Sequence, residues 1–154
     1  MLGEDTIERV SIILDSMICP AADGTITDFD WNIPIPTVDY VARVCYFLRE
    51  LGDEFVMQFI CIAIIYMRRL TDVAITRANV LRLFTIGCIL SNKCHDDESL
   101  SNASWTRFMH TNNEVIRDLE VWFYKSIRWN FYVDETEYYT LEKEILPNNN
   151  VCIR

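Results

Sequence analysis

Two residues of opposite charge, Lys93 and Glu120, lie in two different helical segments with apolar faces. Lys93 lies near the end of one segment and Glu120 within another, so helices packed side by side could bring the ammonium and carboxylate groups together beside apolar surface. An isolated buried charge is costly, whereas a hydrogen-bonded pair at a partner interface can fix orientation and register. The alternative is a pair of exposed helix-end charges, worth about 0–1 kcal/mol if they meet.

The other reactive side chains form no recognisable catalytic or metal-binding set. His95 is followed by Asp96, Asp97 and Glu98, but consecutive residues cannot easily converge on one ion, and no glycine-marked calcium loop is present. A solvated turn is the favoured interpretation. His110 has no Ser or Cys partner in a known motif, and there is no Gly-rich phosphate loop. We therefore expect no catalytic residues, no metal and no cofactor.

Cysteine spacing and hydropathy predict an intracellular chain without a membrane partner. No CxxC motif and no metal-ligand spacing with the two histidines occurs among the six cysteines, which are Cys19, Cys45, Cys61, Cys88, Cys94 and Cys152. Four of them sit in apolar helical segments, where a reduced thiol is a small hydrophobe. Residues 1–10 lack the positive start of a signal peptide, and the longest apolar stretch, residues 55–67, is too short to span a bilayer.

The composition favours a single all-α domain. With 154 residues and 51% hydrophobic content, the chain is long enough for one solid core. Four Gly and four Pro leave little room for the turns of an all-β sandwich or barrel, and the long apolar runs show helical spacing. The net charge of −9, from 23 acidic and 14 basic residues, argues against nucleic acid as a partner.

Apolar periodicity and capping signals predict five helices between residues 37 and 129, with one more on each side. Asp5 and Glu8 are placed to cap the first helix, Thr111 and Glu114 form a capping box before the sixth, and Asp134 opens the last. Segments 54–70 and 80–90 are apolar on nearly every side and should be core helices. The expected helices are Asp5–Ile18, Thr37–Leu51, Glu54–Leu70, Thr76 to about Cys94, Ser101–Met109, one that follows Thr111–Glu114, and a last one ended by Pro147.

The sixth predicted helix and the residues after it carry four large aromatic rings, at Trp122, Phe123, Tyr124 and Trp129. These exceed what one buried stripe holds, so part of the group could form an exposed patch of the kind found at protein interfaces. An equally open alternative is that the first and last helices cover the remaining aromatic rings. The residues expected on the inner face of this helix are Val115, Leu119, Trp122, Phe123, Ser126 and Ile127.

Several short patterns occur in a fixed order along the chain. They are Tyr40-x-x-Arg43, Tyr66-Met67-Arg68-Arg69-Leu70, Asn79-Val80-Leu81-Arg82-Leu83, Ser91-Asn92-Lys93, Ser101-Asn102 and Leu119-Glu120. Their order and spacing, over about residues 5–133, resembles the cyclin box of the phosphate-pathway cyclins of fungi. The chain departs from the family at Arg68, where an acidic residue is expected, and at Met109-His110, which replaces a Gly-Gly pair.

The resemblance implies a five-helix cyclin box at residues 37–131. A helix and a proline-containing loop precede it at 1–36, and a helix and tail follow at 132–154. The implied function is a regulatory subunit that forms a heterodimer with a cyclin-dependent protein kinase and activates it by positioning the mobile helix of its small lobe. Lys93 and Glu120 would then hydrogen-bond the segment leading into that helix. Neighbouring apolar contacts would come from Leu90, Cys94, Tyr124 and Phe131.

Three other functional classes remain open. The first is an all-α adaptor that keeps the cyclin fold but binds a non-kinase protein. A nucleic-acid-binding relative of the fold, as among general transcription factors, is disfavoured by the acidic charge. A small helical enzyme is the least favoured class because no catalytic set is present. We therefore expect the chain to be no enzyme.

Overall fold

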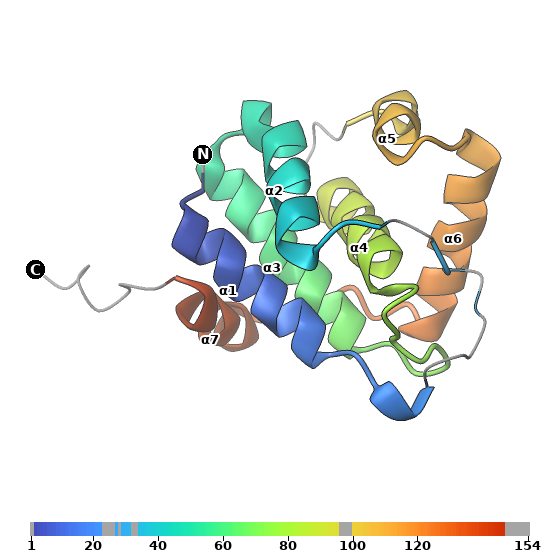
Figure 1. The fold of residues 1–154 in the computed structure, drawn as a ribbon, viewed down its shortest axis with the longest axis horizontal. Coiled ribbons are helices and arrows are strands. Elements are labelled where there is room, and N and C mark those ends of the chain that lie inside the picture. Colours follow the sequence, from blue (N-terminus) through green and yellow to red (C-terminus); the bar gives the residue numbers. More distant parts are fainter. Residues whose placement is uncertain (1, 23–26, 28, 32–33, 96–99, 147–154) are drawn as a thin grey trace, which may run out of the picture.

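The computed structural model describes residues 2–22, 27, 29–31, 34–95 and 100–146. Within these residues it contains seven α-helices, two short 3-10 helices and no strand (Figure 1). The predicted all-α class is confirmed, as are five helices between residues 37 and 129 with one on each side. The α-helices are α1 (Glu4–Ser16), α2 (Thr37–Leu48), α3 (Asp53–Arg68), α4 (Val80–His95), α5 (Asn102–Met109), α6 (Asn113–Ser126) and α7 (Glu135–Ile145), and the 3-10 helices are η1 (Pro20–Ala22) and η2 (Arg49–Leu51).

Helices α3 and α4 form the centre of the molecule (Figure 1). Every side chain of α3 from Phe59 to Met67 is buried, so the prediction that helices apolar on all sides form the core is confirmed. The two helices approach closely at Gly87, where an added Cβ would lie 3.2 Å from the Cβ of Ala63 and 3.3 Å from its carbonyl oxygen. Small residues at this position allow the two backbones to pack closely.

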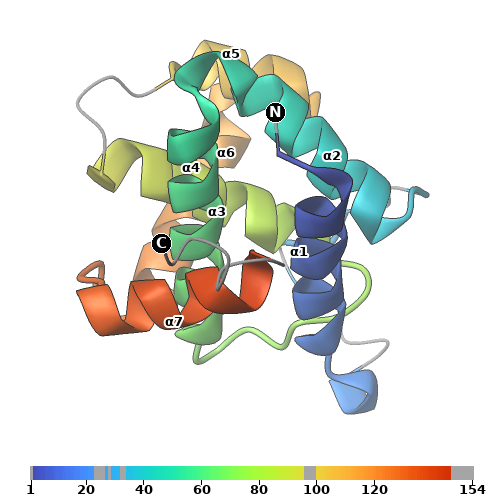
Figure 2. The same ribbon diagram turned by 90° about the vertical axis from the view of Figure 1, so that its left-hand side faces the viewer.

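The first and last helices belong to the same core as the five helices between them. Helix α1 packs on α2 and α7, and α7 also packs on α3 (Figure 2). One hydrophobic cluster extends from Val10 in α1 to Ile145 in α7. On the other side of the core, α6 packs on α4 and α5. None of the helices in the described residues is long and apolar enough to cross a bilayer.

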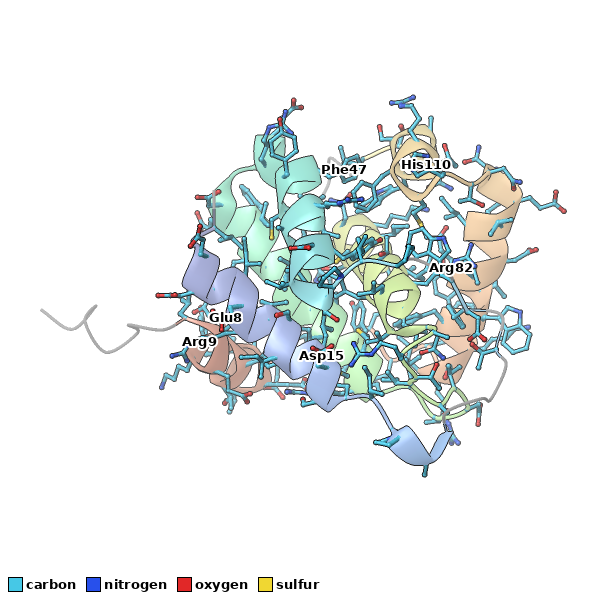
Figure 3. The ribbon with its side chains drawn as sticks, in the orientation of Figure 1. Glu8, Arg9, Asp15, Phe47, Arg82 and His110 are labelled. Carbon is cyan, nitrogen blue, oxygen red and sulfur yellow. The ribbon has the colours of Figure 1, made fainter. Side chains whose placement is uncertain are left out.

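Asp15 links the end of α1 to two segments distant in sequence (Figure 3). Its Oδ1 accepts hydrogen bonds from Thr37 Oγ1 at 2.7 Å and from Arg77 Nη1 at 2.8 Å. Thr37 begins α2, and Arg77 lies between α3 and α4. One carboxylate thus fixes the position of α1 relative to the start of α2 and to the loop that precedes α4.

The N-terminal caps agree with the sequence prediction at α7 but not at α1. The Oδ1 of Asp134 accepts a hydrogen bond from the backbone N–H of Glu137 at 2.8 Å, as predicted. In α1 the N-cap residue is Gly3, and no side chain caps the helix. Asp5 and Glu8 are therefore not capping residues. Asp5 lies in the first turn, where the helix dipole favours a carboxylate.

Helix α6 begins one residue later than the predicted capping box requires. Asn112 is the N-cap, and its Oδ1 accepts a hydrogen bond from the backbone N–H of Val115 at 3.0 Å. The predicted box of Thr111 and Glu114 is therefore wrong. Asn is at least as good an N-cap as Thr, so the Thr-Asn-Asn-Glu sequence offered two starting positions one residue apart.

Other helix boundaries also differ from the predicted ones. The predicted helix from 37 to 51 is divided, because α2 ends at Leu48 and η2 carries the chain to Gly52, whose φ of 92° favours glycine. Helices α1 and α3 each end two residues before the predicted end. Helix α4 begins at Val80, and its predicted cap Thr76 instead donates its backbone N–H to the Oδ1 of Asn79 at 2.8 Å.

Candidate partner-binding site

The packing of α4 against α6 brings Lys93 and Glu120 together. The ammonium Nζ of Lys93 donates to both carboxylate oxygens of Glu120, at 3.1 Å to Oε1 and 2.9 Å to Oε2. The side chain of Glu120 is 4% exposed, whereas that of Lys93 is 32% exposed. The alternative of two exposed helix-end charges is therefore wrong for Glu120, and only the lysine reaches the surface.

The two helices hold both charges in fixed positions. Lys93 lies in the last turn of α4, where the helix dipole favours a cation. Glu120 follows the buried Leu119 in α6. The neighbouring residue Asn92 is fully buried, and its Oδ1 accepts a hydrogen bond from the backbone N–H of Leu100 at 2.8 Å. This bond anchors the end of α4 to the segment that leads into α5.

Aromatic side chains gather beside the ion pair. The ring centroids of Tyr124 and Phe131 are 5.5 Å apart, and those of Tyr66 and Phe131 are 5.7 Å apart, both in edge-to-face contact. The hydroxyl of Tyr66 donates to the carbonyl oxygen of Phe131 at 3.1 Å and is hydrogen-bonded to Nε2 of His95 at 2.7 Å. The chain after α6 is thereby held against the ends of α3 and α4.

The turn after α6 contains two residues in the left-handed region, Arg128 with φ of 56° and Trp129 with φ of 60°. Such conformations cost free energy in residues other than glycine. The backbone N–H of Trp129 donates to the carbonyl of Tyr124 at 2.9 Å, and Arg69 donates to the carbonyl of Asn130 at 2.8 Å. These bonds hold the turn in place, with the Trp129 side chain 62% exposed beside the aromatic cluster.

Burial sets the protonation of the groups around the pair. Partial burial and the Glu120 carboxylate raise the pKa of the Cys94 thiol, and the same two causes raise the pKa of Tyr124. Partial burial lowers the pKa of His95. Near neutral pH these three side chains are therefore uncharged, and the charges of the site are those of the mutually neutralising Lys93–Glu120 pair.

The residues predicted to surround the pair differ in accessibility. Cys94 is exposed, and Tyr124 and Phe131 are partly exposed, so all three reach the surface next to Lys93. Leu90 is only 1% exposed and belongs to the core, so it offers a partner no surface. Trp122 is 54% exposed, so its predicted place on the inner face of α6 is wrong. We use the name Lys93 site for Lys93, Glu120, Cys94, Tyr124 and Phe131.

Sequence reasoning did not assign Tyr66 or His95 to this site. The hydroxyl of a buried tyrosine needs a hydrogen-bond partner, which is the only signal that the sequence offered. The partners of Tyr66 lie 29 residues away, at His95, and 65 residues away, at Phe131. Local patterns do not identify partners at such separations.

The structure also bears on the sites that the sequence disfavoured. No group of His, Cys, Asp and Glu within the described residues could hold a metal ion. The five cysteines of the described part of the chain are free thiols. The sequence predictions at 96–98, Pro147 and Cys152 fall outside the described residues. Arg68, at the position where the sequence resemblance predicts an acidic residue, lies 3.8 Å from the carboxylate of Glu144.

A groove of about 830 Å³ lies between α2 and α5, with Phe47 and His110 on its two sides (Figure 3). Its floor is aromatic, and the rings of Phe47 and Phe108 stack at 4.6 Å. Its charged lining residues are the arginines Arg43, Arg49 and Arg107, and no acidic side chain lines it within the described residues. We call it the arginine-rimmed groove. Its charge is opposite in sign to the net charge of the chain.

Comparisons with known proteins did not identify a relative: no protein-family model matches this chain, and no curated protein matches it. The geometry of the site is therefore the main basis for inferring a function.

Proposed function

We propose that this chain is a cyclin-like regulatory subunit that binds a cyclin-dependent protein kinase and positions the mobile helix of its small lobe. The observation that carries the proposal is the Lys93–Glu120 pair, in which a buried carboxylate holds a partly exposed ammonium beside accessible aromatic side chains. The resemblance to the cyclin box expects a lysine and a glutamate in these roles. The two come from different helices, so their contact depends on the fold.

The geometry favours different roles for the two residues. An ammonium has three N–H donors, and Glu120 accepts two hydrogen bonds from Lys93. The third donor can reach a backbone carbonyl of a partner, because the lysine is partly exposed. Glu120 is almost fully buried, so it acts mainly by fixing the direction of the lysine. Tyr124 and Phe131 supply apolar surface next to this contact.

Binding of this kind can activate a kinase without any catalytic group from the regulatory subunit. Phosphoryl transfer in kinases requires an ion pair between a strand lysine of the small lobe and a glutamate of the mobile helix. A partner that binds only the productive arrangement shifts the population toward it. A shift from 1:99 to 99:1 needs about 5.5 kcal/mol of differential binding, which a few well-packed contact residues can supply.

The test is binding and activation of a kinase by purified variants. Tagged wild-type chain is used to recover kinases from the source cells, and affinity for the recovered kinase is then measured by calorimetry. Lys93→Ala and Glu120→Ala should weaken binding by about 2–5 kcal/mol with unchanged helical content. Lys125→Ala, which removes an exposed lysine from α6, is the matched control and should bind like wild type. Wild-type binding by both site variants, or recovery of no kinase, would refute the proposal.

The arginine-rimmed groove favours a second candidate, an all-α cyclin-fold adaptor that binds a non-kinase protein. Within the described residues Arg43 and Arg107 have no hydrogen bond or ion pair from their side chains, although the chain carries an excess of carboxylates. An acidic partner would neutralise them over an apolar floor. If the adaptor is correct, Arg43→Ala with Arg107→Ala abolishes partner recovery and Lys93→Ala does not. The kinase proposal expects the reverse.

A further inference from the structure

A second groove, of about 680 Å³, lies where α7 crosses and contacts α3 (Figure 2). Its floor is apolar, with Met57 and Ile62 from α3 and Val133, Tyr138 and Leu146 from the segment that contains α7. Met57 and Ile62 are buried, and the other three are partly exposed. We call it the α3–α7 groove. It is built from different helices than the arginine-rimmed groove, and Lys93 does not line it, whereas His95 from the end of α4 does.

Five carboxylates line this groove together with its apolar residues. Asp53 and Glu54 line it from the start of α3, and Asp134, Glu135 and Glu142 line it from the side of α7. No lysine or arginine lines the groove within the described part of the chain. An apolar groove whose charged lining residues are acidic is complementary to a basic amphipathic segment.

The carboxylates of α7 differ in whether they have cationic partners. Glu137 pairs with Arg69 at 2.7 Å, and Glu144 lies 3.8 Å from Arg68, so the carboxylates on that side have cationic partners. Glu135 and Glu142 are seven positions apart and share the groove face of the helix. Neither has a cationic partner within the described residues. The groove face is thus the side of α7 on which negative charge is left without a counter-charge.

The stability of α3 and α7 explains only some of the carboxylates that line the groove. Glu54 and Glu135 lie in the first turns of α3 and α7, where the helix dipole favours an anion, and Asp134 caps α7. Glu142 lies in the last turn of α7, where the dipole disfavours an anion. The only hydrogen bond to its carboxylate among the described residues comes from the Tyr138 hydroxyl, at 3.2 Å. The helix dipole therefore does not explain a carboxylate at this position.

We propose that the α3–α7 groove is a docking site for a basic amphipathic segment of a partner protein. Apolar side chains of that segment would rest on Met57 and its neighbours, and its lysine or arginine side chains would reach the carboxylates that line the groove. The lining of α3 runs from residue 53 to 62, about 14 Å at 1.5 Å per residue, which suits a segment of about four extended residues or two to three helical turns. The site does not depend on whether the chain binds a kinase.

The test begins with the full chain as bait for a displayed library of random 12-residue peptides. Enriched peptides are then synthesised with a fluorescent label, and their affinity is measured by anisotropy. We expect them to combine several lysines or arginines with at least one large apolar residue. Enrichment of neutral or acidic peptides, or of no peptide, would overturn the proposal.

The decisive comparison is between two variants with the same change of charge. Glu142→Lys should weaken the selected peptides at least about tenfold, because attraction at the groove becomes repulsion. It should leave the Tm of the free chain unchanged or higher, because a cation suits the last turn of a helix. Asp118→Lys, at an exposed position of α6, should weaken them less than about twofold.

Three results would contradict the site. Equal weakening by Glu142→Lys and Asp118→Lys would mean that basic peptides respond only to the net charge of the chain. Full binding by Glu142→Lys would place the peptides elsewhere. A dimer of the free chain that Glu142→Lys dissociates would make a second copy of this chain the occupant. Should Glu142→Lys fail to fold, the double variant Glu135→Gln with Glu142→Gln removes both charges at almost constant side-chain size, and unchanged peptide affinity in it would also overturn the proposal.

Discussion

Replacing Lys93 by Met should destabilise the protein more than replacing Glu120 by Gln. Breaking a fully buried ion pair by removing one partner costs about 3–5 kcal/mol, because a buried charge is left uncompensated. The Glu120 side chain is 4% exposed and loses both of its hydrogen bonds from Lys93 in the first variant. Since Lys93 is 32% exposed, water can reach one side of the carboxylate, and we expect a loss of about 2 kcal/mol.

The reverse substitution leaves a less costly defect. In Glu120→Gln the ammonium of Lys93 can turn into solvent, and the amide oxygen can still accept one hydrogen bond. We expect a loss of about 0.5–1 kcal/mol. The variant then separates fold from function, because Lys93 is present but no longer directed by a carboxylate. Weaker kinase binding at nearly normal stability would identify Glu120 as a positioning residue.

Urea denaturation of both single variants and the double variant measures these losses. With a slope of about 1–3 kcal/mol per molar urea, a 2 kcal/mol loss lowers the midpoint by about 1 M. The double-mutant cycle should give a coupling energy of about 1 kcal/mol between the two side chains. Lys125→Met, on the exposed face of α6, is the control and should stay within about 0.5 kcal/mol of wild type. A greater loss in Glu120→Gln than in Lys93→Met would refute this account of the pair.

Three further predictions concern the core, a helix cap and pH. Gly87→Ala should destabilise the protein by about 1–2 kcal/mol in urea denaturation, because the added Cβ meets the carbonyl oxygen of Ala63 at 3.3 Å and this overpacking outweighs the gain of about 1 kcal/mol in helix propensity. A more stable variant would contradict this. Asn112→Ala should cost about 1 kcal/mol and Thr111→Ala less than about 0.5 kcal/mol, because Asn112 is the N-cap; the reverse order in thermal unfolding would support the capping box instead. Burial lowers the pKa of His95, so folding favours its neutral form, and the associated stability is present above about pH 6.5 and is lost as pH falls from there toward the lowered native pKa. An NMR titration of the His95 ring should give a pKa below that of a solvent-exposed histidine. A pKa equal to or above that value would contradict this prediction.

Helix number and the identity of the core helices could be predicted from the sequence because both depend on local periodicity. The segment that became α3 is apolar on all sides, and only a central position buries such a helix. Helix starts were less predictable. Thr111 and Asn112 are both good N-cap residues, and the choice between them depends on how α6 packs against α4 and α5.

The site could be predicted only in part. The spacing of Lys93 and Glu120 alone left open whether they meet, and their pairing was predicted from the sequence resemblance; the structure joins them. Leu90 lies one turn before Cys94 on α4, so spacing alone places both on one face, but the core covers α4 until its last turn and only Cys94 is accessible. The hydrogen bond from the Tyr66 hydroxyl to the chain after α6 could not be predicted, because it joins residues far apart in sequence.

Local charge, and not the net charge of −9, determines which partners each surface of this molecule could accept. The Lys93 site carries a self-neutralised pair, the arginine-rimmed groove is cationic, and the α3–α7 groove is anionic. Exposed charges act over about 10 Å at 0.1 M salt, so an acidic partner is repelled by the chain at long range and attracted only at the arginines. Rising salt should therefore weaken a basic peptide in both its association rate and its affinity. For an acidic partner of the arginine-rimmed groove, rising salt should increase the association rate while it weakens the final contact. The association rates of the basic peptide and of the acidic partner should therefore change in opposite directions as salt rises.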